Sequence, residues 1–144
     1  MKTFLRCVLA LVLGLVVGSC VNLGLVLLSP HVIPPPPGVD VNDAKSLSAS
    51  MHLFEPKHFL FPFLAHALGT LCGAAVGYLV AARYRSVMAY AIGALFLAGG
   101  IAAAFMIPAP AWFIGTDLVL AYLPMAWLGS LAGGKLSKAA GPAS

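Results

Sequence analysis

Apolar residues occur in four long blocks along the chain, separated by shorter polar stretches. The blocks cover residues 4–28, 58–82, 86–106 and 112–131. A helix needs about 20 predominantly apolar residues to cross a bilayer, and each block reaches that length. The pattern predicts an all-α protein, an integral membrane four-helix bundle that forms a single transmembrane domain over residues 1–144.

The polar loop 29–57 between the first two blocks carries its own pattern. Pro34 to Pro37 must be extended, because proline fixes φ and restricts the residue before it. Beyond them, Asn42 or Asp43 can cap a short helix. Its apolar positions share one face: Leu47, Met51 and Phe54. The loop therefore predicts a short amphipathic helix that lies on the membrane surface or over the mouth of the bundle.

Composition supports the bilayer as the solvent. Soluble domains are about 25% charged, whereas this chain is 8% charged and 61% hydrophobic. The net charge of +4 comes from basic residues scattered singly at the ends of the apolar blocks. We therefore expect the lipid bilayer, and no nucleic acid, as a partner.

The basic residues also predict an orientation. Under a four-span arrangement one side carries Lys2, Arg6, Arg83, Arg85, Lys135 and Lys138. The other side carries only Lys45 and Lys57. Cytoplasmic loops are enriched in Lys and Arg, so the N- and C-termini are expected in the cytoplasm and loop 29–57 outside it.

One alternative concerns the first block. Val17-Gly18-Ser19-Cys20 is similar to a bacterial lipobox, and cleavage there would leave a lipidated Cys20 and three spans. The apolar run continues to Leu28, however, which is full spanning length rather than the short apolar region of a signal peptide. The uncleaved four-span reading is therefore preferred.

Small residues recur every four positions in the second block, at Ala65, Gly69, Gly73, Gly77 and Ala81. Such a face lets two helix backbones approach closely in lipid. The helix-packing face Gly69, Gly73 and Gly77 could meet another helix of the same chain, or it could form the seam of a homo-oligomer.

Among the polar residues inside the apolar blocks, three from different blocks lie at a similar depth: Asn22, His66 and Asp117. At about 1.5 Å per residue they lie roughly 9, 12 and 8 Å below the extracytoplasmic boundary. Polar groups at membrane depth are costly and need partners, so an intramembrane polar cluster is predicted. It could be a polar lock between helices, a pocket or proton-linked site built on the imidazole, or three unrelated positions.

A second candidate site lies in the loop. His52, Glu55 and His58 supply ligand types that suit zinc or another divalent metal ion. Pro56 interrupts the helix that would place them on one face. The alternative is an interfacial anchor formed with neighbouring phenylalanines. No other cofactor is expected, and Cys7, Cys20 and Cys72 lack metal or redox spacing.

Three segments carry a resemblance to known proteins: Met51 to His58, Phe61 to Thr70, and Pro108 to Phe113. They resemble a group of small, four-span bacterial membrane proteins without an assigned function. The resemblance implies a bacterial cytoplasmic (inner) membrane and implies no catalytic residues.

These features favour a small multi-pass membrane protein of accessory or structural type over an enzyme. It would self-associate or join another membrane protein in a larger complex. The alternative is a small-solute or proton-linked transporter with an outward-facing site at Asn22, His66 and Asp117. A third possibility is a metal-dependent membrane enzyme that uses His52, Glu55 and His58.

Overall fold

The computed structural model describes residues 2–141, and within that range it contains helices and no strands. The α-helices are α1 (Lys2–Val32), α2 (Ala44–Ser50), α3 (Leu60–Val80), α4 (Arg85–Met106), α5 (Ala111–Leu120) and α6 (Leu123–Ala139). Two 3₁₀ helices, η1 (Met51–Leu53) and η2 (Pro56–Phe59), precede α3. Four stretches are long and apolar enough to cross a membrane: Thr3–Val32, Pro56–Val80, Arg85–Met106 and Ala111–Ala139. The all-α, four-span fold is therefore confirmed.

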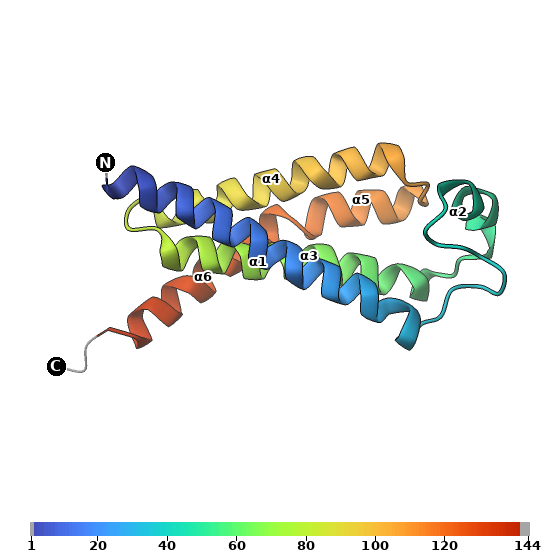
Figure 1. Cartoon of the computed structure of the whole chain (residues 1–144), viewed down its shortest axis with the longest axis horizontal. Coiled ribbons are helices and arrows are strands. Elements are labelled where there is room, and N and C mark those ends of the chain that lie inside the picture. The colour runs from blue at the N-terminus through green and yellow to red at the C-terminus, as the bar shows by residue number, and fades with distance from the viewer. Residues whose placement is uncertain (1, 142–144) are drawn as a thin grey trace.

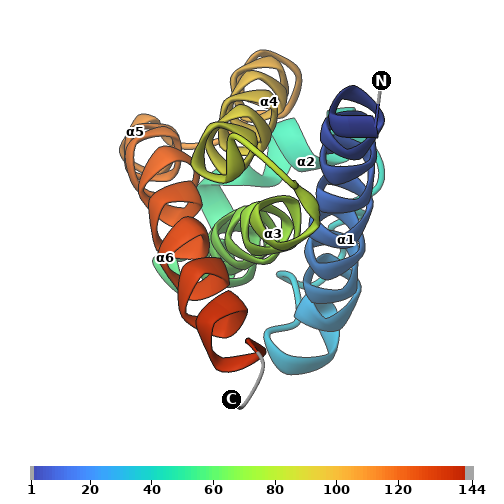
Figure 2. The ribbon, with the colours of Figure 1, turned by 90° about the vertical axis from the view of Figure 1, so that its left-hand side faces the viewer.

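Helix α3 occupies the centre of the bundle. Seen along the bundle axis, α1, α4 and the α5–α6 pair surround it (Figure 2). Its span is 39% buried, against 11% for the span that contains α1. Helix α1 makes most of its contacts with α3 and few with α4. The first helix is thus attached to the bundle largely through one neighbour.

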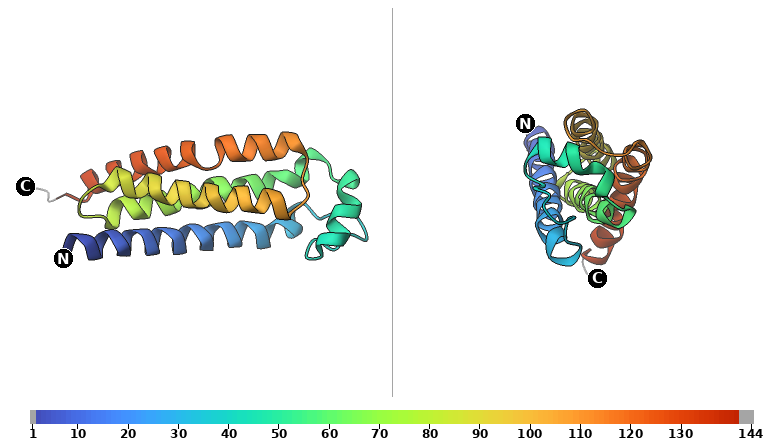
Figure 3. Two further views of the ribbon diagram at one scale, coloured as in Figure 1. Left: turned by 90° about the horizontal axis from the view of Figure 1, so that it is seen from above. Right: turned by 90° about the vertical axis from the view of Figure 1, so that its right-hand side faces the viewer.

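The two ends of the bundle differ in what they carry. Both the N- and C-terminal ends of the chain lie at one end, which we call the terminal end (Figure 1). The opposite end, the loop end, carries α2, η1 and η2 folded across the helices (Figure 3). An even number of long helices joined end to end places the two termini together in this way.

The fourth span is not one straight helix over 112–131, as the sequence pattern predicted. It breaks between α5 and α6 at Ala121 and Tyr122, and α6 continues to Ala139. Pro124 explains the break, because it lacks an N–H for the carbonyl four residues earlier and its ring clashes there. Tyr122 takes a non-helical conformation with φ −117° and ψ −81°.

Two other boundaries also differ from the predicted ones. Helix α1 runs on through Pro30 to Val32, four residues beyond the predicted end. The loop helix ends at Ser50 instead of continuing to Phe54, which is already extended. Asp43 is the cap, since its side chain accepts the backbone N–H groups of Lys45 and Ser46.

The glycines of α3 face α1 within the same chain. A Cβ added to Gly73 would lie 2.6 Å from the carbonyl oxygen of Gly14, and one on Gly69 would lie 2.8 Å from that of Gly18. A Cβ on Gly77 would overlap the side chain of Ile92. The helices therefore touch backbone to backbone, as small-residue packing in lipid allows. Within the chain, this face is therefore covered by α1 at Gly69 and Gly73 and by Ile92 of α4 at Gly77.

Candidate functional site

The site begins with a polar contact between α3 and α5. The His66 Nδ1–H donates to the Asp117 carboxylate, at 2.9 Å from each oxygen. Because the carboxylate can only accept, the proton of a neutral imidazole belongs on Nδ1. The Asp117 side chain is 7% exposed and that of His66 is 28% exposed. Two residues 51 positions apart, each predicted to lie at membrane depth, are thus brought together.

Tyr122 is the third member of this network, and sequence reasoning missed it. Its hydroxyl donates to Asp117 Oδ2 at 3.1 Å, and its ring stacks on the His66 ring with centroids 5.7 Å apart. Tyr122 is buried at the break between α5 and α6. The signal was Pro124, which predicts a local break that turns a nearby side chain back toward α5.

Asp117 therefore holds three segments together. Its carboxylate accepts from α3 through His66 and from the α5–α6 junction through Tyr122, while its own backbone belongs to α5. A carboxylate with two donors is well satisfied at membrane depth, where an unpaired charge would be strongly unfavourable.

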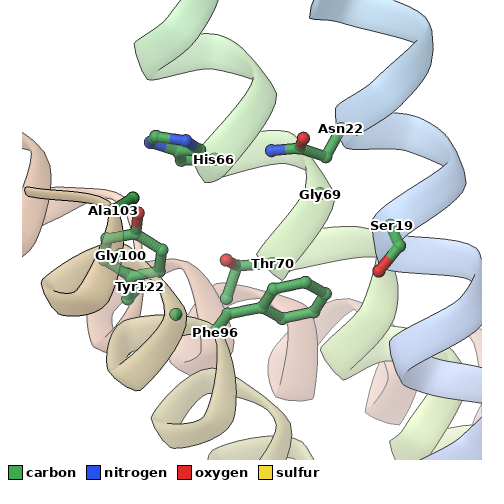
Figure 4. Close-up of a pocket in the computed structure, with 10 residues that line it drawn as sticks. Ser19, Asn22, His66, Gly69, Thr70, Phe96, Gly100, Ala103 and Tyr122 are labelled. Carbon is green, nitrogen blue, oxygen red and sulfur yellow. The ribbon is translucent and has the colours of Figure 1, made fainter. Parts of the chain in front are cut away.

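Asn22 lies beside this network across a pocket. The pocket has a volume of about 190 Å³ and is lined mainly by α1, α3 and α4. Figure 4 shows the Asn22 amide and the His66 ring facing one another from α1 and α3. No hydrogen bond joins Asn22 to His66 or Asp117 among the described residues. Of the three residues predicted to form the polar cluster, His66 and Asp117 thus bond to each other, whereas Asn22 lies across the pocket from them.

The two threonines near the cluster behave differently. Thr116 Oγ1 donates to the backbone oxygen of Trp112 at 2.8 Å, one turn back on its own helix. Thr70 is fully buried, lines the pocket, and its Oγ1 has no hydrogen-bond partner among residues 2–141. A buried hydroxyl without a partner is unusual and calls for an explanation.

The loop residues His52, Glu55 and His58 do not come together as a ligand set. Glu55 and His58 form a reciprocal capping box at the start of η2, in which His58 Nδ1 accepts the Glu55 N–H at 2.9 Å. Glu55 also pairs with Lys57 at 3.1 Å. Within the described range, no group of three His, Cys, Asp or Glu side chains is arranged to hold a metal ion.

Aromatic contacts account for the rest of the loop end. The His58 ring meets the Phe54 ring edge to face at 5.4 Å. Phe59 is buried and packs on Trp112 and Phe113, with centroids 5.5 and 4.9 Å apart. This geometry favours the interfacial-anchor interpretation of the loop over a metal site.

Fold and site together define a small helical membrane protein with a buried polar network, built on His66, Asp117 and Tyr122, between its helices. We found no match to a protein family, to a curated protein or to a solved structure.

Proposed function

We propose that this protein is a small multi-pass membrane protein of accessory type, which binds a membrane partner or a second copy of itself. One observation carries the proposal: Asp117 is 5% exposed and both of its oxygens are engaged by His66 and Tyr122. The most strongly polar group inside the spans thus joins helices. That arrangement supports a structural lock more than a substrate-binding carboxylate.

The binding surface in this proposal is the outer face of α1. Only 11% of its span is buried, the lowest share of the four spans. The exposed face is a continuous aliphatic surface that includes Val12 and Val16, which are 51% and 52% exposed. Helices in lipid associate through van der Waals packing. Helix α1 leaves this face open to a partner because it contacts mainly α3 and, to a small extent, α4.

The proposed location is the cytoplasmic membrane of a bacterium, with both termini in the cytoplasm. The terminal end of the bundle carries the α3–α4 turn with Arg83 and Arg85, and also Arg6 near the start of α1 and Lys138 near the end of α6. The positive-inside rule assigns that end to the cytoplasm. Reporter enzymes fused after Ser144 and inserted after Gly38 should report opposite sides of the membrane.

Site-specific photocrosslinking in native membranes tests the proposal. A crosslinker at Val12 or Val16 should give a discrete protein adduct, of the chain with itself or with a partner. The matched control is Leu131 of α6, which is 46% exposed and lies on another face. Adducts at all three positions alike, or lipid adducts only, would contradict binding through α1.

A second candidate function is small-solute or proton-linked transport through the pocket beside His66. The observation in its favour is the polar lining that Asn22, His66 and Thr70 contribute at one level. Asp117→Asn separates the candidates because it keeps the shape and removes the titratable group. Accessory binding should survive this change, whereas proton flux into liposomes containing the protein should be lost if transport is the function.

A further inference from the structure

The pocket beside His66 contains polar groups that take no part in the His66–Asp117–Tyr122 network. Thr70 Oγ1 is fully buried and unpartnered in the described chain, and it faces a space of about 190 Å³. A threonine in a helix can ordinarily bond a backbone carbonyl one turn earlier, as Thr116 does with Trp112. Thr70 leaves its hydroxyl to the pocket instead. A space of this size also exceeds what a few ordered waters need.

Two other polar groups that line the pocket, outside the His66–Asp117–Tyr122 network, are neutral and can both donate and accept. Asn22 contributes a primary amide and Ser19 a hydroxyl, both from α1. The lining contains no Lys, Arg, Asp or Glu. Phe96 supplies a flat apolar wall from α4 (Figure 4). Such a set suits a neutral hydroxyl-bearing group better than an ion, because each hydroxyl of the ligand can donate and accept in turn.

The mouth of the pocket lies between α1 and α4. Lining residues from the centre of the bundle, Thr70 and Tyr122, are buried, whereas Ser19 of α1 and Gly99 of α4 are exposed. A Cβ at Gly99 would meet no atom within 4 Å, so space is open there. Ser19 lies near the middle of α1, far from both ends. The opening therefore faces the side of the bundle, where lipid lies, rather than either aqueous end.

We infer that this pocket binds the hydroxyl-bearing head of a neutral lipid, with Thr70 as the central hydrogen-bonding residue. The hydroxyl group would enter between α1 and α4 and pair with Thr70 and Asn22. Its acyl chains would remain along the exposed aliphatic faces of these helices. The inference goes beyond the accessory function and does not depend on it, since a lipid could occupy the pocket whether or not a protein binds α1.

Native mass spectrometry of the purified full-length protein tests the site, with dioleoylglycerol as the probe. The wild-type protein should retain one molecule, and trioleoylglycerol, which has no free hydroxyl, should not be retained. Thr70→Val should weaken retention about tenfold, the loss expected for one or two hydrogen bonds to a neutral group. Thr116→Val is the matched control, because its hydroxyl is engaged outside the pocket, and it should bind as the wild type does.

A second pair of variants keeps the test decisive if Thr70→Val does not fold. Gly99→Leu should block the mouth and abolish retention, whereas Gly115→Leu should not, although a Cβ at either position meets open space. Equal retention by all variants, or equal retention of trioleoylglycerol, would overturn the site. Free glycerol is tested as a third ligand. If glycerol binds in a Thr70-dependent way and dioleoylglycerol does not bind, the pocket recognises hydroxyl groups but not a lipid, and the inference is overturned.

Discussion

Helix α3 meets its neighbours in two different ways. On one side it touches α1 through Gly69 and Gly73, with the two backbones in direct contact. On the other side it meets α5 and the α5–α6 break through His66, Asp117 and Tyr122. The first contact has close packing and, among the side chains that the structure describes, no hydrogen bond from α1 to α3. The second has a buried polar network.

The difference shows what each helix needs in a lipid environment. Helices gain little from burying apolar surface against each other there, so they associate by close packing or by polar bonds. Helix α1 packs on α3 through its middle, from Ala10 to Asn22, and relies on close packing there. The α5–α6 pair is broken at Pro124, and a polar network holds the break. Beyond the break α6 again packs closely on α3, where a Cβ on Gly129 would lie 2.5 Å from the carbonyl oxygen of Leu71.

The largest effect is expected from Gly73→Val, which separates α1 from α3. The added side chain would meet the Gly14 carbonyl and the Gly18 backbone, and neither can move independently of its helix. Overpacking of this kind should lower the free energy of unfolding by about 3 kcal/mol. Denaturant unfolding in micelles measures the change.

Gly24→Val is the control for that substitution, because a Cβ at Gly24 has nothing within 4 Å. It should change the free energy of unfolding by less than about 0.5 kcal/mol. Equal losses in the two variants would show that helix propensity, and not the α1–α3 contact, determines the effect.

A smaller effect is expected from Tyr122→Phe, which removes one donor to Asp117 and keeps the stacked ring. Loss of this buried hydrogen bond should cost about 1 kcal/mol of unfolding free energy. Tyr90→Phe serves as the control, since Tyr90 is 41% exposed on α4. If both variants lose the same amount, the hydroxyl of Tyr122 does not stabilise the break.

The smallest effect concerns the loop end, outside both contacts. Glu55→Ala removes one half of the capping box with His58 and should cost about 0.5 kcal/mol. Amide exchange at His58 should become faster, with the bundle amides unchanged. Lys57→Ala, which removes only the exposed Lys57–Glu55 pair, should leave the exchange at His58 unaffected.

Much of the fold could be predicted from local patterns. Block length and hydropathy define four spans, and spacing by four identifies the glycine face of α3. The cap at Asp43 follows from the chemistry of a single side chain. Each of these features depends on residues close together in the sequence, which is why the sequence is enough.

The rest depends on three-dimensional placement. Equal depth suggested that Asn22 would join His66 and Asp117, but depth does not specify the direction around a helix axis, and a pocket separates Asn22 from the pair. Tyr122 was missed because its orientation depends on the break at Pro124. Nor could the sequence decide whether the glycine face meets α1 or a second copy.

A double-mutant cycle on His66 and Asp117 tests the central claim, that this pair locks α3 to α5. His66→Ala, Asp117→Ala and the double variant are compared by free energy of unfolding in micelles. The account predicts a coupling of about 1–2 kcal/mol, because each single variant leaves the other polar group without its partner. Losses that add to within about 0.3 kcal/mol would contradict the lock.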